Sequence, residues 1–91
     1  MDLNKKYSVD VDNIDYRIIG NKTVILNVNS AYFYTLDEVG TAIWKELVKQ
    51  KTLNEIAALM MEEYDVNEDE LKHDIVELVN EMDKEKLIKP Q

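Results

Sequence analysis

The sequence contains no cysteine, and it has only two glycines and one proline among its 91 residues. Without cysteine the chain forms no disulfide, which fits a protein of the reducing cytoplasm. Its apolar runs fall short of the ~18 residues that a membrane-spanning helix needs. The segment of residues 1–13 lacks the apolar stretch and the cleavage site of a signal peptide. We therefore expect a cytoplasmic protein without a membrane partner, folded as a single domain of residues 1–91.

Basic side chains are also scarce. The chain has 11 Lys and Arg residues against 19 Asp and Glu residues, and its net charge is −8. A charge of this sign repels the phosphate backbone of DNA or RNA at long range. We therefore expect no nucleic-acid partner.

Catalytic chemistry has few candidate residues. The single histidine, His73, is followed by Glu77 at helical spacing, and such a pair can contact a metal ion. A structural or catalytic zinc site needs three or four ligands, however, so the pair is interpreted as part of a solvated acidic helix face. Gly20 and Gly40 are isolated and do not form a phosphate-binding loop. We predict no enzymatic activity, no catalytic residue, no metal and no cofactor.

The first half of the chain has the pattern of a small sheet. Three β-like runs, at residues 16–19, 24–28 and 31–36, are separated by the turn sequences Gly20-Asn21 and Asn29-Ser30. This spacing predicts an antiparallel meander with the second run in the centre. Residues 1–12 are expected to be extended or frayed. The central run has one apolar face, made of Val24, Leu26 and Val28.

The second half has helical periodicity. Asp37 is a plausible N-cap, "TLNE" at residues 52–55 is a capping box, and "NEDE" at residues 67–70 resembles one. Three helices are therefore predicted. With the meander they give an α+β fold of the winged helix-turn-helix type. The apolar stripe of the third helix is Leu71, Ile75, Leu78, Val79 and Met82.

A winged helix-turn-helix scaffold raises the alternative of a DNA-binding regulator, in which the third helix would read the bases. Such a helix needs arginine, lysine or amide side chains toward the DNA. The third helix here carries mainly Asp and Glu, so DNA binding is disfavoured. A further alternative is a general adaptor that docks on an enzyme through its acidic helices. The acidic side chains of this helix are Glu68, Asp69, Glu70, Asp74, Glu77 and Glu81.

The segment "AYFYTLDEVGTAIWKEL" resembles the core signature of PqqD-like proteins, the recognition elements for precursors of ribosomally synthesised and post-translationally modified peptides. The resemblance extends over about residues 15–88. The sequence departs from the family pattern at Asp37, where asparagine is usual, and at Lys86, where glycine is usual. The residues that align with the signature, in order, are Ala31, Phe33, Tyr34, Leu36, Asp37 (in place of asparagine), Gly40, Ile43 and Trp44.

The resemblance implies a non-catalytic protein that binds the leader segment of a precursor peptide. It would present this leader to a modifying enzyme or a leader peptidase of the same pathway. The leader is expected to add as a strand beside residues 31–36 and to lie in a groove next to the third helix. A lasso-peptide pathway is the leading expectation, and quinone-cofactor and radical-modified peptide pathways are the alternatives.

The expected site residues come from the third strand and the third helix. Leu78 and Met82 are expected to be partly exposed, and Asp74 to meet a basic leader residue. The competing interpretation is that the aromatic rings of the strand only complete a thin core. The expected peptide-binding residues are Tyr32, Phe33, Tyr34, Thr35, Asp74, Ile75, Leu78, Val79 and Met82.

Overall fold

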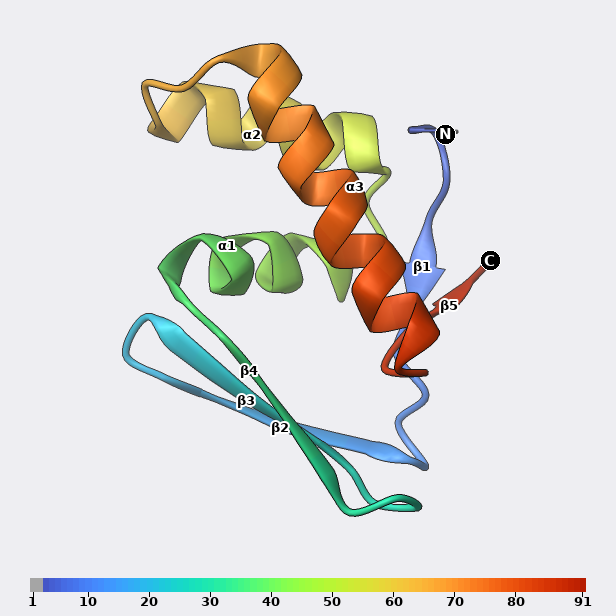
Figure 1. Cartoon of the computed structure of the whole chain (residues 1–91). Helices are drawn as coiled ribbons and strands as arrows, with labels where there is room; N and C mark the ends of the chain where they lie inside the picture. The colour runs from blue at the N-terminus through green and yellow to red at the C-terminus, as the bar shows by residue number, and fades with distance from the viewer. Residues whose placement is uncertain (1–2) are drawn as a thin grey trace.

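The computed structural model describes residues 3–91, which form two antiparallel sheets and three helices. Figure 1 shows the helices stacked over one face of the larger sheet. The predicted α+β fold, a three-stranded antiparallel sheet followed by three helices, is confirmed. The elements are β1 (Tyr7–Ser8), β2 (Ile14–Ile19), β3 (Lys22–Asn27), β4 (Tyr32–Leu36), α1 (Glu38–Leu47), α2 (Leu53–Glu63), α3 (Glu68–Lys84) and β5 (Lys89–Pro90).

The larger sheet has the order β2-β3-β4, with β3 in the centre as predicted. A two-residue turn joins β2 to β3, and its first residue, Gly20, has a φ of +64°, which glycine adopts without strain. β2 begins at Ile14, two residues before the predicted start, and β3 begins at Lys22. β4 begins at Tyr32, one residue after the predicted start of the third strand, because Ala31 has a positive φ of 56°. Within residues 3–91, β4 pairs only with β3, so its other edge is open.

The face of the sheet that packs against the helices includes Thr23 and Ile25 of β3, both fully buried. The Thr23 hydroxyl lies 2.7 Å from the Thr41 hydroxyl of α1, and this hydrogen bond satisfies two polar groups inside the core. The apolar face predicted from Val24 and Leu26 is therefore the opposite face, directed away from the helices. A threonine that is paired across the core can face inward, which simple alternation of apolar residues does not reveal.

Each helix begins at a side chain that accepts a hydrogen bond from the backbone N–H three residues later. The cap residues are Asp37, Thr52 and Asn67, with distances of 2.9, 3.1 and 3.1 Å. The Glu55 carboxylate accepts a hydrogen bond from the Thr52 N–H at 2.8 Å, which completes the predicted capping box. All three predicted helix starts are confirmed. None of the helices in the described residues combines the length and apolar character needed to span a membrane.

One core joins the sheet to the helices. Trp44 of α1 is fully buried in this core, and the Tyr16 ring of β2 packs edge to face against it with the ring centroids 5.2 Å apart. The core takes side chains from every helix, including Ile43, Leu47, Leu53, Ile56, Met60, Leu71, Ile75, Val79 and Met82.

The two ends of the chain lie side by side. β1 pairs with β5, placing Tyr7 opposite Pro90, and the Tyr7 side chain is buried. β1 supplies two residues of the segment 1–12 that was predicted to be extended or frayed, and residues 1–2 of that segment lie outside the described residues. β5 was not predicted, because a strand of two residues has no periodicity to detect.

Helix α3 ends where the family pattern carries a glycine. Lys86 adopts a positive φ of 60° there. The Lys86 N–H donates to the Asp83 carbonyl at 3.0 Å, and the Leu87 N–H donates to the Met82 carbonyl at 2.9 Å. These two bonds form a Schellman motif, in which glycine is favoured because a side chain strains the left-handed position. Leu87 is fully buried behind it.

Candidate functional site

The open edge of β4 offers backbone groups whose direction follows from the strand register. The Val28 N–H donates to the Asn13 carbonyl of the β2 side at 2.9 Å. Hydrogen-bonding direction alternates along an antiparallel strand. Odd-numbered residues of β3 therefore point their backbone groups toward β4, where Ile25 lies opposite Tyr34 and Thr23 lies opposite Leu36.

The backbone groups of the two intervening residues, Phe33 and Thr35, consequently point away from the sheet. Each of them offers one N–H and one C=O. They form a short ladder without a strand neighbour in the described part of the chain. This ladder is the chemical basis for adding a further strand.

A groove of about 570 Å³ runs along this edge, between β4 and α3. Gly40 lies at its wall, and a Cβ atom there would stand 3.1 Å from the Leu36 Cβ, closer than side chains normally approach. Glycine therefore lets α1 start close against the end of β4. The groove is lined by Tyr34, Thr35, Leu36 and Asp37 at the strand, by Val39, Gly40 and Ile43 of α1, and by Asp74 and Leu78 of α3.

The predicted site residues divide into three groups by position. Tyr34, Thr35, Asp74 and Leu78 line the groove. Tyr32 and Phe33 are exposed on β4, and the Phe33 side chain is 62% exposed. Phe33 lies beside Val24 and Leu26 on the face of the sheet that is directed away from the helices.

The third group is buried in the core below α3 and comprises Ile75, Val79 and Met82. The expectation that Met82 is partly exposed is wrong. Successive residues of a helix are rotated by about 100°, so Leu78 and Met82, four residues apart, differ by about 40° around the helix axis. This offset leaves Met82 in the core and Leu78 at its boundary. These three side chains hold α3 in place and present no surface to the groove, whereas Leu78 sits at the boundary.

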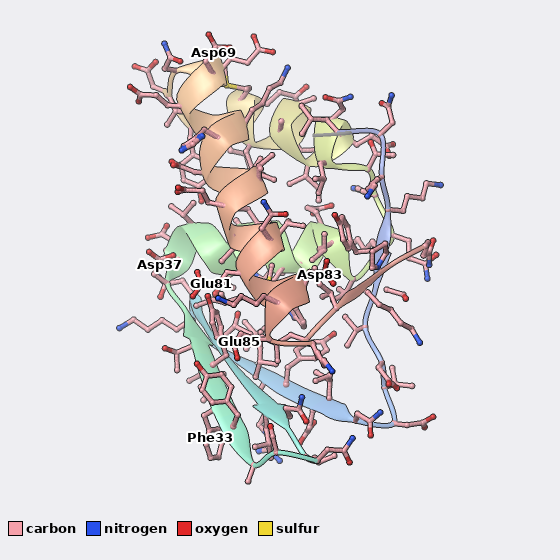
Figure 2. All side chains as sticks on the ribbon, turned by 45° about the vertical axis from the view of Figure 1, so that its right-hand side comes forward. Phe33, Asp37, Asp69, Glu81, Asp83 and Glu85 are labelled. Carbon is pink, nitrogen blue, oxygen red and sulfur yellow. The ribbon has the colours of Figure 1, made fainter. Side chains whose placement is uncertain are left out.

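Two carboxylates near Tyr34, Glu81 and Glu85, are absent from the expected site residues. Figure 2 shows both on the side of α3 that faces β4, with Asp37 at the end of that strand. Burial and the nearby Glu81 carboxylate raise the pKa of the Tyr34 hydroxyl well above its usual range, so that it remains a donor. The signal available in the sequence was the spacing of these carboxylates: Glu81 follows Asp74 by seven residues, and Glu85 follows Glu81 by four. Side chains at such spacings share one face of a helix.

No comparable cluster suggests a metal centre. The His73 Nε2 atom lies 3.3 Å from the Glu77 Oε1 atom, and both side chains are largely exposed to solvent. In residues 3–91, no three His, Cys, Asp or Glu side chains are arranged to hold a metal ion. The groove beside β4 offers backbone groups, apolar side chains and carboxylates, which are features of a binding surface.

The family model of coenzyme PQQ synthesis protein D (PqqD) matches residues 22–88, from β3 through α3 to the residue before β5. No curated protein sequence matches the chain at a significant level.

Two solved structures share the fold. One is TbiB1 in complex with the TbiA(beta) leader peptide, with a TM-score of 0.84 and 23% identity, covering 90% of this chain and 94% of that one. The other is a lasso peptide synthetase B1 complexed with the leader peptide, with a TM-score of 0.84 and 19% identity, covering 93% of this chain and 99% of that one.

Proposed function

The chain belongs to the PqqD family, and from this membership and the open edge of β4 we propose that it binds the leader segment of a ribosomally made precursor peptide. The leader pairs as an additional strand with the outward backbone groups of Phe33 and Thr35. The observation that carries the proposal is the combination of this unpaired ladder with a groove beside it. Both similar structures hold a leader peptide, which supports this reading.

Backbone pairing alone is too weak for tight binding. Two residues with a donor and an acceptor each provide about four hydrogen bonds, worth roughly 0.5–1.5 kcal/mol apiece. Association itself costs at least ~4 kcal/mol. Leader side chains must therefore also be buried in the groove, each contributing roughly 1.5–3 kcal/mol.

The groove supplies suitable surfaces for those side chains. Tyr34 and Leu78 offer apolar area on opposite sides, and Tyr32 extends the strand side. Asp74 and Glu81 provide carboxylates on α3 that suit a basic leader residue. Ile75, Val79 and Met82 act indirectly, by fixing the position of α3.

The protein's role is presentation rather than catalysis. It holds the leader so that a modifying enzyme or leader peptidase of the same pathway acts on the precursor. A lasso-peptide pathway is favoured, because one of the similar structures is a lasso peptide synthetase B1. The acidic surface of α3 gives no support to the alternative of a DNA-binding regulator.

A direct titration tests the function. A synthetic, fluorescein-labelled peptide with the leader sequence of the precursor encoded beside this gene is mixed with increasing amounts of the protein. We expect saturable anisotropy with a Kd in the micromolar range or below. A scrambled peptide of the same composition is the control. Equal binding of both peptides, or of neither, would contradict the proposal.

A further inference from the structure

We propose that the leader continues past the end of β4 and inserts one apolar side chain into a second pocket, between α1, α2 and α3. This inference rests on the proposed function and adds a requirement for the leader's sequence. The pocket is lined mainly by apolar side chains from separate parts of the chain: Val39, Met60, Tyr64, Val66 and Leu71.

The second pocket joins the groove. Val39 and Asp74 line both hollows, so the pocket begins where the groove ends. Moving from Asp74 to Glu70 is one turn of α3, or about 5.4 Å. An extended peptide advances about 3.3 Å per residue, so about two leader residues span this step. The side chain that enters the pocket therefore lies about two positions beyond the leader residue that passes Asp74.

The size of the pocket fits one side chain. It encloses about 140 Å³. An apolar cavity of about 150 Å³ in another protein accommodates benzene. The occupant is therefore a single branched aliphatic or aromatic side chain.

The rim of the pocket has apolar side chains that the chain itself leaves partly uncovered, and carboxylates that lie outside the ion pairs of the described residues. Val39 and Val66 are 42% and 41% exposed, although both line this apolar hollow. Glu70 and Asp74 lie beside them, and neither takes part in the ion pairs found in residues 3–91. An apolar leader side chain with a lysine or arginine next to it would cover the valines and meet the carboxylates.

The test uses Val66→Asp, because Val66 lines the pocket but not the groove. It lies in the exposed link between α2 and α3, where the substitution leaves the core intact. We expect the Kd for the labelled leader peptide to rise at least about tenfold. Met61→Asp is the matched control, since Met61 is similarly exposed on α2 and lines neither hollow; its Kd should stay within about twofold of the unaltered protein.

A leader variant completes the experiment. Replacing the apolar leader residue by aspartate should weaken binding to the unaltered protein but cause little further loss with Val66→Asp, because both changes remove the same contact. Independent, additive losses would overturn the proposal. An unchanged Kd for Val66→Asp would also overturn it and leave strand addition at β4 intact, whereas a peptide that fails to bind even the unaltered protein contradicts the proposed function first.

Discussion

The two edge strands of the larger sheet, β2 and β4, differ in charge although each has one open side in the described residues. β2 has the sequence IDYRII and carries Asp15 and Arg17, whereas β4 has the sequence YFYTL and carries no charge. Charged side chains on an edge strand discourage pairing with another chain. One edge is therefore protected against strand addition, and the other is not.

Their surroundings differ as well. β4 alone borders the groove made with α3, which places Leu78 and Asp74 beside the open ladder. A short ladder in open water binds weakly, because its gain barely exceeds the cost of association. An open edge therefore becomes a binding site when side-chain pockets lie next to it.

The largest effect is expected from proline at Tyr34, whose backbone groups point toward β3. Tyr34→Pro removes a hydrogen bond inside the sheet together with a half-buried ring. We expect the free energy of unfolding to fall by about 3 kcal/mol or more, measured by urea denaturation with circular dichroism. Tyr34→Ala separates the two causes, since it removes only the ring. Equal stability of these two variants would show that the assigned backbone direction is wrong.

A change on the helix side of the groove should affect binding rather than folding. Leu78 is only partly buried, so Leu78→Asp should leave the circular dichroism spectrum unchanged. It should raise the Kd for the leader peptide by about tenfold to a hundredfold, because an apolar contact worth roughly 1.5–3 kcal/mol is lost. Met61→Asp again serves as the control. The groove would be excluded as the binding surface if both variants bound the leader equally well.

Removing the charges of β2 should make its edge resemble that of β4. The double variant Asp15→Val, Arg17→Val has no charged side chain on β2, and we expect it to self-associate as its concentration rises. Light scattering would detect this association. Leader affinity at low protein concentration should change by less than about twofold, because β4 is untouched. A variant that scatters light like the unaltered protein at high concentration would argue that these charges do not protect the edge.

The smallest effect concerns the end of α3, where stability can be changed without altering either edge. Lys86 holds a left-handed conformation that a side chain strains. We expect Lys86→Gly to stabilise the fold by about 0.5–1 kcal/mol in urea denaturation, with no change in leader binding. Lys86→Ala is the matched control, since it removes the long side chain and keeps the strain. Equal stability of the two variants would rule out strain as the reason.

Local signals predicted much of the fold. The three helix starts were correct because a cap depends on residues three positions apart, as at Thr52 and Glu55. The turn at Gly20 and the order of the three strands follow from equally short-range patterns. Features that depend on distant contacts were not visible: the burial of Thr23, which needs its partner in α1, and the pairing of Tyr7 with Pro90.

The candidate site was predicted in outline but not in detail. The resemblance to PqqD-like proteins implied a site at the third strand and the third helix, yet it did not separate Leu78 at the groove from Met82 in the core. Their separation depends on how α3 is rotated against the rest of the fold. Val39 and Val66 were not among the expected site residues, because they meet only when α1 is packed beside the link between α2 and α3.

The central claim is that the leader pairs with the outward backbone groups of β4. Thr35→Pro tests it most directly, since proline removes an N–H that points away from the sheet and is tolerated at an open edge. Thr35→Ala removes the same side chain and keeps the donor. We expect both variants to stay folded, and the proline variant to bind the leader peptide at least about fivefold more weakly than the alanine variant in anisotropy titrations. Equal leader affinity of the two folded variants would contradict strand addition at β4.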